Sequence, residues 1–302
     1  MEVALASLIH EWQPDLLHTH LIRMAPYTRG MKNIPRVLDL TDAVSLYLRR
    51  FRDIHSNPLL RWMLGVELGR MTNFESVISD FQRVLVCSEV DQRVLKNHAP
   101  DARVDILPNG VDQEGFSPNG SVVRDPRRII LTGNMSYYPN ADAARYFVRR
   151  VLPIIQKTIP EVKLFIVGQN PPWSVRRLAG NDVTVTGFVS DIRGEYLKST
   201  VAVSPVRFGA GTLNKILEPL ALGIPVVATP VSVQGMNPPH KGILVGRTTE
   251  ELAEAVVRVF REPLYHEEAV NASEEIRSLY GWNRVSEMLE QLYADVLDPG
   301  HM

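Results

Sequence analysis

The chain has 302 residues, which is enough for two domains, and 45% of them are hydrophobic, as in ordinary globular proteins. Its 33 Lys and Arg against 34 Asp and Glu give a formal net charge of -1, so no overall field recruits nucleic acid or an anionic membrane. Cys87 is the only cysteine, which excludes an intrachain disulfide and a Cys-rich metal cluster and fits a reducing compartment.

Short apolar, β-branched runs alternate with longer segments of helical period, which indicates parallel sheets built from βαβ units and an α/β fold. In the first half, the predicted strands are residues 14–19, 36–41, 83–88 and 104–108. A doubly wound domain usually opens with a strand and a glycine turn, and residues 1–13 offer neither. We therefore expect an N-terminal domain, residues 1–120, that is truncated.

A polar segment with two Pro and one Gly, residues 118–127, predicts the linker to a second domain, residues 121–280. Helical segments again separate short strands in this half, and three helices follow, the last ending near Leu297. The predicted strands of the second half are residues 128–132, 162–167, 183–187, 201–205, 225–229 and 242–245.

The segment that most clearly indicates a binding site is PVRFGAGTLNKILE, residues 205–218, which predicts a strand end, a glycine-rich turn and a helix. Gly209 and Gly211 permit close backbone approach, and a helix starting near Thr212 would aim its free N–H groups at an anion in the turn. A diphosphate fits this design. Arg207 and Lys215 would bind its oxygens without a metal ion.

Asn214, Lys215 and Glu218 share one helix face, because they lie three and four positions apart. That face is suited to span a nucleotide, with the carboxylate of Glu218 accepting hydrogen bonds from ribose hydroxyls. The plainer interpretation is a glycine turn with a solvated lysine and a glutamate paired to a nearby base. The combination of residue types in one strand, turn and helix favours phosphate binding.

These residues resemble the retaining glycosyltransferases of GT-B fold, glycosyltransferase family 4. Three stretches carry the resemblance over nearly the whole chain: LPNGVD from Leu107 with FSP from Phe116, VTGFV from Val185, and the block from Arg207 to Glu218 that continues as EPLALGIPVV. The phrase TGNMSYYPN from Thr132 and the pair Asn214 and Lys215 are similar to bacterial exopolysaccharide-associated sugar transferases.

The resemblance implies two Rossmann-like doubly wound domains that face each other, with a final helix, residues 281–302, that returns to the N-terminal domain. It implies a nucleotide diphosphate sugar, with a uridine base, bound to the C-terminal domain. Glu218 would hold the ribose, Arg207 and Lys215 the diphosphate, and the backbone around Phe188 and Val189 the base. The strand-end turn Gly133-Asn134 would line the phosphate pocket, beyond the carboxyl ends of the strands. The donor-binding set is therefore Gly133, Asn134, Phe188, Val189, Gly209, Gly211, Thr212, Asn214 and Glu218.

In the first half, His18 and His20 at a strand end match the family's histidine pair, and His20 is the catalytic candidate beside Arg207 and Lys215. An imidazole there would bond the donor sugar or accept the acceptor's proton. A structural role for either histidine is the alternative, and a zinc site is disfavoured for want of further ligands. Asp42 is the acceptor-side candidate, although capping of the next helix is the favoured role on sequence alone.

The implied activity is retaining, metal-independent transfer of a sugar to a glycan, lipid-linked or small-molecule acceptor, with no cofactor besides the nucleotide sugar. We expect a cytoplasmic location, because signal-peptide and membrane-spanning patterns are absent. The basic and apolar stretches LYLRRFR from Leu46 and RWML from Arg61 leave peripheral contact with the inner membrane face open, although ordinary domain surface is favoured.

The sequence departs from the family pattern at Ala210, where many members carry a first Glu, and at Asn134, where many carry Arg. The exopolysaccharide subgroup is similar in both respects. A non-catalytic nucleotide-sugar-binding protein or fragment of the same fold is the main alternative, and a nucleotide-sugar epimerase is a second. A dinucleotide-dependent oxidoreductase is disfavoured, because no strand is followed by G-x-G-x-x-G and a later acidic residue.

Overall fold

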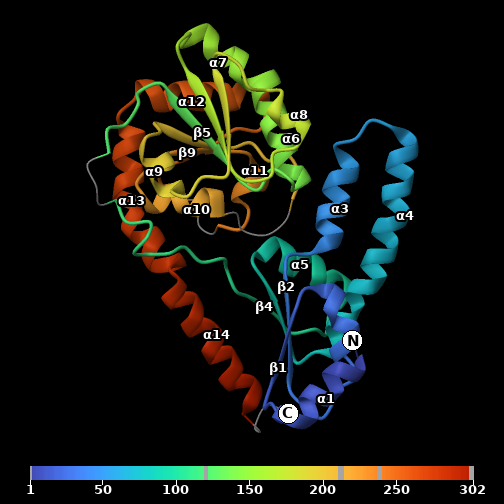
Figure 1. Ribbon diagram of the computed structural model, residues 1–302. Helices are drawn as coiled ribbons and strands as arrows, with labels where there is room; N and C mark the ends of the chain where they lie inside the picture. Colours follow the sequence, from blue (N-terminus) through green and yellow to red (C-terminus); the bar gives the residue numbers. More distant parts are fainter. Residues whose placement is uncertain (1, 119–121, 210–213, 237–239, 299–302) are drawn as a thin grey trace. The chain divides into compact units, whose positions relative to one another are not determined.

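The computed structural model describes residues 2–118, 122–209, 214–236 and 240–298, and it divides the chain into two compact units (Figure 1). Unit 1 consists of Met1–Pro108 together with Val285–Met302, and unit 2 of Asn109–Arg284. The linker predicted at residues 118–127 falls partly outside the described residues.

Unit 1 is built on a four-stranded parallel sheet in the order β1-β2-β3-β4. Its strands are β1 (Leu17–His20), β2 (Arg36–Thr41), β3 (Arg83–Val86) and β4 (Val104–Ile106). Its helices are α1 (Glu2–Trp12), α2 (Ala25–Thr28), α3 (Val44–Asp53), α4 (Pro58–Glu75) and α5 (Glu89–His98), with short 3-10 turns at Ile22–Met24 and Ser76–Asp80. The register aligns His20 with Asp39, so side chains at the carboxyl ends of β1 and β2 lie next to each other.

The last helix, α14 (Trp282–Leu297), packs on the sheet of unit 1 although most of the chain before it belongs to unit 2. Val296 is buried with Val37 of β2 and Leu85 of β3. Leu289, Leu292 and Tyr293, which sit three and four positions apart on one helix face, extend this contact.

Unit 2 is built on a six-stranded parallel sheet in the order β10-β9-β8-β5-β6-β7. Its strands are β5 (Arg128–Thr132), β6 (Lys163–Val167), β7 (Val183–Gly187), β8 (Val201–Ser204), β9 (Val226–Ala228) and β10 (Ile243–Val245). Its helices are α6 (Tyr138–Tyr146), α7 (Leu152–Thr158), α8 (Trp173–Arg176), α9 (Ile192–Leu197), α10 (Asn214–Ala221), α11 (Pro230–Val233), α12 (Thr249–Arg261) and α13 (Leu264–Tyr280), with a π-helical turn η3 (Phe147–Val151) between α6 and α7.

The strand order of unit 2 is that of a doubly wound sheet, in which the direction of winding reverses between β5 and β8. Ligands of such sheets bind beyond the carboxyl ends of the strands at this reversal. The fold therefore predicts a ligand site at the ends of β5 and β8, before any side chain is considered.

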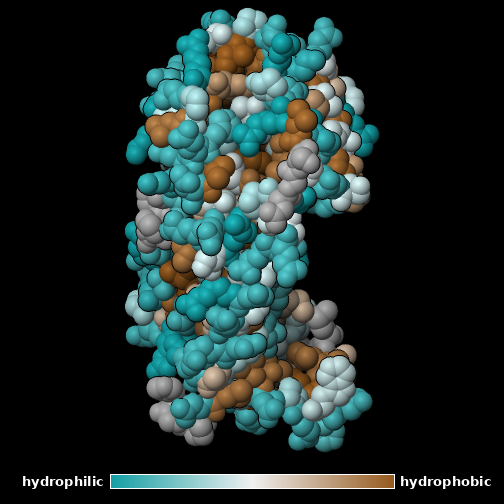
Figure 2. Space-filling view, turned by 90° about the vertical axis from the view of Figure 1, so that its left-hand side faces the viewer, coloured by the Kyte–Doolittle hydropathy of each residue, from teal (hydrophilic) through white to brown (hydrophobic). Residues whose placement is uncertain are grey.

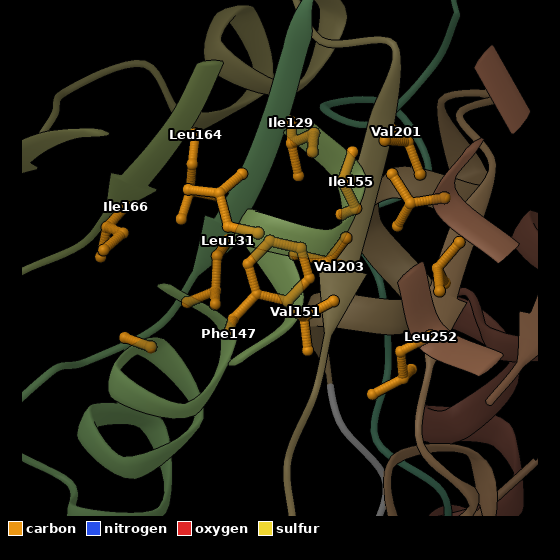
Figure 3. Packing of buried hydrophobic residues seen from close by; sticks show 14 of the residues in the cluster. Ile129, Leu131, Phe147, Val151, Ile155, Leu164, Ile166, Val201, Val203 and Leu252 are labelled. Carbon is orange, nitrogen blue, oxygen red and sulfur yellow. The ribbon is translucent and has the colours of Figure 1, made fainter. Parts of the chain in front are cut away.

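The main core of unit 2 lies between this sheet and the helices on one of its faces (Figure 3). Ile129 and Leu131 of β5 pack with Leu164 of β6 against Phe147 and Ile155, and four of these side chains are fully buried. The strands are short apolar runs because a parallel sheet is covered on both faces. Burial of each such side chain stabilises the folded state by about 1.5–3 kcal/mol. Outside the cores, the face in Figure 2 is mostly hydrophilic, with apolar residues in small groups.

The strands predicted from the sequence are all present, with ends shifted by a few residues, and so are the three C-terminal helices α12, α13 and α14. The α/β class with two parallel sheets is confirmed. None of the helices in the described ranges combines the length and the apolar character needed to cross a membrane.

Candidate functional site

A cavity of about 500 Å3 opens in unit 2 at the carboxyl ends of β5, β6 and β7, and it thus includes the end of β5, one of the two strands between which the sheet reverses. Its walls come from the turns after these strands and from the start of α10. The lining residues are Asn109, Thr132, Gly133, Asn134, Asn140, Val167, Gly168, Gln169, Phe188, Val189, Ile192, Asn214, Lys215 and Glu218. We call this space the switch-point cavity.

Two glycines allow the strand-end turns to meet at the floor of the switch-point cavity. Gly133 follows β5 and Gly168 follows β6, and both have a φ of 149°, which L side chains rarely adopt. A Cβ on Gly168 would collide with the carbonyl oxygen of Gly133, and a Cβ on Gly133 would come within 2.7 Å of the side-chain nitrogen of Asn140. The two turns therefore approach each other as closely as backbone permits.

Lys215 lies in the first turn of α10, and its ammonium group donates a hydrogen bond to the side-chain oxygen of Asn140. The side-chain nitrogen of Asn140 in turn donates to the carbonyl oxygen of Asn134, at 2.9 Å. Burial lowers the pKa of Lys215 to about 8, although the nearby carboxylate of Glu218 opposes this shift. The ammonium group is thus aimed into a cavity in which an anion would strongly favour its charged form.

Glu218 lies one turn deeper in α10, and its carboxylate accepts a hydrogen bond of 3.1 Å from the hydroxyl of Tyr196. Tyr196 is fully buried and shares a 2.7 Å hydrogen bond with Thr132 at the end of β5. Burial raises the pKa of Glu218, while the bond from Tyr196 and the charge of Lys215 act to lower it. Cation and carboxylate on one face of the cavity suit a ligand that carries both an anionic group and hydroxyls.

The predicted base-facing residues Phe188 and Val189 follow β7 and line the same cavity. Phe188 is 75% exposed, so its ring is accessible for stacking on a planar group. Asn214, at the first position of α10, lines the cavity as well and is exposed.

The glycine-rich turn before α10 is described only in part. Gly209 has a φ of 155° and is buried, whereas Gly211 and Thr212 lie outside the described residues. The expected anion contact of a helix that starts near Thr212 falls in this same segment. The first described residue of α10 is Asn214.

Arg207 lines a second cavity and is not among the lining residues of the switch-point cavity. Its guanidinium group donates two hydrogen bonds, of 2.8 and 2.7 Å, to the carboxylate of Asp142 in α6. The group also lies 5.1 Å from the ring centroid of Tyr146. The bonds to Asp142 raise the pKa of Arg207 despite its burial. That Arg207 and Lys215 bind one diphosphate stays a prediction, and in the structure the partner of Arg207 is Asp142.

In unit 1, His18 and His20 both contact the carboxylate of Asp39. The Nδ1 atom of His20 lies 3.1 Å from Oδ2 of Asp39, and the Nε2 atom of His18 lies 3.6 Å from it. His18 also makes a 2.7 Å hydrogen bond to Tyr293 of α14. The exposed side chain of His20 is thus oriented by a carboxylate, an arrangement found for histidines that transfer protons.

Burial opposes ionisation of Asp39, but hydrogen bonds from His18, from the Thr41 amide and from His20 lower its pKa overall. Leu21 and Thr41, which follow His20 and Asp39, have φ values of 71° and 66°. Backbone strain of this kind is typical of functional sites. The ends of β1 and β2 therefore carry two independent marks of a site.

The favoured capping role of Asp42 is wrong. The residue at the N-cap of α3 is Ala43, and it makes no side-chain cap. The amide of Ala43 instead donates to Asp91 at 2.9 Å, and that of Ser45 donates to the buried carboxylate of Glu75 at 2.8 Å. These two carboxylates come from distant parts of the chain and accept the bonds from the amides at the start of α3. Capping of this helix is therefore not the role of Asp42. Burial, and then the charges of Asp91 and Glu75, raise the pKa of Asp42 to about 6.

Asn140, which lines the switch-point cavity, and Tyr196, which donates a hydrogen bond to Glu218, are among the residues that carry no role in the sequence-based prediction. Asn140 stands in the phrase TGNMSYYPN, so its position at the start of a helix after a strand gave a signal. Tyr196 gave none, because only the fold brings α9 beneath Glu218. Within the described ranges, no group of three His, Cys, Asp or Glu side chains is arranged to hold a metal ion.

Two family models match the chain, one over each half. Residues 2–114 match the model described as Glycosyltransferase Family 4, and residues 126–262 match the model described as Glycosyl transferases group 1. The second match contains every residue of the switch-point cavity except Asn109.

Individual proteins are similar at lower identity. Phosphatidyl-myo-inositol mannosyltransferase of Mycobacterium leprae (strain TN) is 24% identical over 202 residues, which are 64% of this chain and 54% of that protein. The chain thus spans about half the length of this curated relative. The solved structure of sucrose-phosphate synthase from Thermosynechococcus elongatus aligns with 98% of this chain and 77% of its own, at a TM-score of 0.77 and 17% identity. Anabaena HepE in complex with UDP-glucose aligns with 97% of this chain and 82% of its own, at a TM-score of 0.73 and 14% identity. These likenesses show the GT-B fold.

Proposed function

Since the chain consists of two glycosyltransferase domains in a GT-B fold, we propose that it transfers a sugar from a nucleotide diphosphate sugar to an acceptor, with retention of the anomeric configuration and without a metal ion. The observation that carries this proposal is that Lys215 and Glu218 line one cavity at the switch point of the unit 2 sheet. A similar solved structure that holds UDP-glucose supports a uridine donor.

In this cavity, the ammonium group of Lys215 binds the diphosphate, and the backbone of Gly133 and Asn134 lets the phosphates approach the end of β5. The carboxylate of Glu218, held by Tyr196, accepts hydrogen bonds from the ribose hydroxyls. The exposed ring of Phe188 stacks on the base, with Val189 beside it. Gly209, Gly211, Thr212 and Asn214 complete the donor site from the turn before α10.

Catalysis in this proposal is electrostatic. The bond from the anomeric carbon to the diphosphate oxygen breaks while the acceptor oxygen attacks from the same face, and Lys215 stabilises the negative charge that develops on the leaving oxygen. The departing diphosphate, or His20 oriented by Asp39, takes the acceptor's proton. Asp42 binds the acceptor. Arg207, paired with Asp142, acts on the diphosphate only if that pair opens.

The acceptor class that we propose is a glycan, lipid-linked or small molecule in bacterial exopolysaccharide or other glycan synthesis. Support comes from the segment TGNMSYYPN, because its residues Asn134 and Asn140 both line the switch-point cavity. We place the reaction in the cytoplasm, at the inner membrane face when the acceptor is a lipid.

The decisive test needs no known acceptor, because water can replace the acceptor hydroxyl as the attacking group. UDP-α-glucose is incubated with the protein in the presence of a chelator, and the anomer of the glucose released first is identified by proton NMR. Release of the α anomer, abolished in Lys215→Ala, supports retention without metal. Release of the β anomer would refute retention. Tight donor binding with no release, even when candidate acceptors are added, would favour a non-catalytic nucleotide-sugar-binding protein.

A further inference from the structure

The second cavity of unit 2, of about 490 Å3, concentrates positive charge in a chain whose net charge is only -1. It is bounded by α6, the π-helical turn η3, the residues just after α8 and the segment after β8. Five arginines and one carboxylate, that of Asp142, line it. The arginines are Arg145, Arg149, Arg150, Arg177 and Arg207. We call this space the arginine cavity.

Asp142 neutralises only part of this charge. It accepts two hydrogen bonds from Arg207, and an oxygen of its carboxylate lies 3.8 Å from Arg145. Across the described ranges, no carboxylate oxygen lies within 4.0 Å of the guanidinium groups of Arg149, Arg150 or Arg177. The cavity therefore holds a surplus of positive charge that the protein itself does not pair.

Aromatic rings stand beside these cations. Arg145 lies 5.4 Å from the ring centroid of Tyr138, and Arg177 lies 4.6 Å from that of Trp173. Tyr138 and Tyr146 both line the cavity. Guanidinium groups held against ring faces are fixed in orientation, which prepares them for a ligand.

The backbone that presents Arg149 and Arg150 is also unusual. Both belong to η3, a π-helical turn inserted between α6 and α7. Such turns are rare and are frequent at functional sites, and the extra residue changes the direction of side chains that a regular helix would space differently. The charge surplus and the π-helical turn are independent observations, and they coincide in one cavity.

We propose that the arginine cavity is a second anion site, separate from the donor site, that binds a phosphate-bearing ligand with at least two negative charges, either a diphosphate or a sugar phosphate. Three unpaired guanidinium groups call for more than one negative charge, and their planar forks match phosphate oxygens in bidentate pairs. The site stands on the residues of this cavity alone, so it does not depend on the proposed function.

The test is calorimetric titration of inorganic pyrophosphate at fixed ionic strength. The protein carries Lys215→Ala, so that the lysine of the switch-point cavity does not contribute to the binding. Adding Arg149→Ala and Arg177→Ala should weaken this binding at least about tenfold, because each removes a charged bidentate partner. The matched control adds Arg247→Ala and Arg261→Ala, two exposed arginines of unit 2 outside both cavities, and should stay within about twofold.

Because Arg149 and Arg177 are exposed, their replacement should leave folding intact, and thermal unfolding of each variant checks this. Arg149→Lys with Arg177→Lys, which keeps the charge but not the fork, should give an intermediate loss. The proposal is overturned if Lys215→Ala alone abolishes pyrophosphate binding, a result that would leave the donor site standing. Equal losses in the cavity variant and the control variant would overturn it too.

The diphosphate has two sources, free ligands and lipid-linked acceptors, and co-sedimentation distinguishes them. Phosphatidylcholine vesicles with and without a polyprenyl diphosphate are compared for the wild type and for the Arg149→Ala, Arg177→Ala variant. Binding only to the diphosphate-bearing vesicles, lost in the variant, assigns the site to a lipid-linked diphosphate. Pyrophosphate binding without vesicle binding assigns it to a soluble one.

Discussion

The carboxylate of Glu218, which lines the switch-point cavity, accepts a 3.1 Å hydrogen bond from the hydroxyl of the fully buried Tyr196. Hydrogen bonding to the charged form of a carboxylate favours that form. Here the bond counters the burial that raises the pKa of Glu218. In the proposed donor site, Tyr196 would therefore act as a positioning residue that favours the ionised form of Glu218 and orients its carboxylate.

Replacing Tyr196 with Phe removes this hydrogen bond and changes little in volume. We expect UDP affinity to fall about tenfold at pH 7, and further as the pH falls, because Glu218 then takes up a proton more readily. Calorimetry between pH 5.5 and 8 measures both effects. Tyr265→Phe, which removes a hydroxyl that accepts a hydrogen bond from Arg258 in the same unit and lies outside both cavities, is the control. A pH-independent loss in Tyr196→Phe would assign Tyr196 a merely structural role.

The lowered pKa of Lys215, about 8, predicts how donor binding depends on alkaline pH. The ammonium group binds the diphosphate and the neutral amine does not, so UDP affinity should fall up to about tenfold between pH 7 and pH 9. The second ionisation of the terminal phosphate, with a pKa of about 6, is complete below this range. Lys215→Arg, which stays charged, should flatten the fall. An affinity for UDP that is constant to pH 9 in the wild type would contradict the assignment.

The close approach of Gly168 to Gly133 predicts that even a methyl group is too large at position 168. Gly168→Ala should lower the free energy of unfolding by about 1–3 kcal/mol and weaken UDP binding, because the turn after β6 must move away from the turn after β5. Gly180→Ala is the matched control, since a Cβ there meets nothing within 4 Å. Denaturant unfolding and calorimetry on both variants check this, and equal effects would refute it.

The raised pKa of Asp42, about 6 against 3.8 for a free carboxyl group, predicts the sign of its effect on stability. The folded state holds the proton more tightly than the unfolded state, so the contribution of Asp42 is favourable at low pH and is lost as the pH rises from about 4 to about 6. Asp42→Asn should therefore raise the free energy of unfolding by about 1–3 kcal/mol at pH 7.5 and change it little at pH 4.

The exposed Asp101 of the same unit provides the control, and Asp101→Asn should shift stability by less than about 0.5 kcal/mol at either pH. Thermal and denaturant unfolding at the two pH values give the comparison. An Asp42→Asn variant that is destabilised at pH 7.5 would show that the carboxylate has a favourable partner.

The fold could be read from the sequence because parallel strands buried on both faces are short apolar runs, and those of β5 and β6 stand out from their polar flanks. The cavity contacts of Lys215 and Glu218 could also be predicted, since helix geometry fixes which residues share a face. Local periodicity carries this information without any tertiary structure.

The remaining features depend on pairs of residues far apart in the chain. Arg207 is eight positions from Lys215 in sequence, yet Asp142, which is 65 residues away, holds it in another cavity. The backbone amides at the start of α3 donate to the carboxylates of Glu75 and Asp91 rather than to the adjacent Asp42. No local sequence pattern predicts such partners, because the contacts form only when the sheet and its helices pack together.

The most direct test of the donor site is calorimetric titration of UDP and UDP-glucose, without added metal, into the wild type and into Glu218→Ala and Lys215→Ala. The matched controls are Lys241→Ala and Glu254→Ala, which remove exposed charges of the same sign outside the cavity. We predict micromolar to sub-millimolar binding that both cavity variants lose and both controls keep. Absence of UDP binding to the wild type, or binding that Glu218→Ala and Lys215→Ala leave unchanged, would contradict a nucleotide-sugar site at the switch point of this sheet.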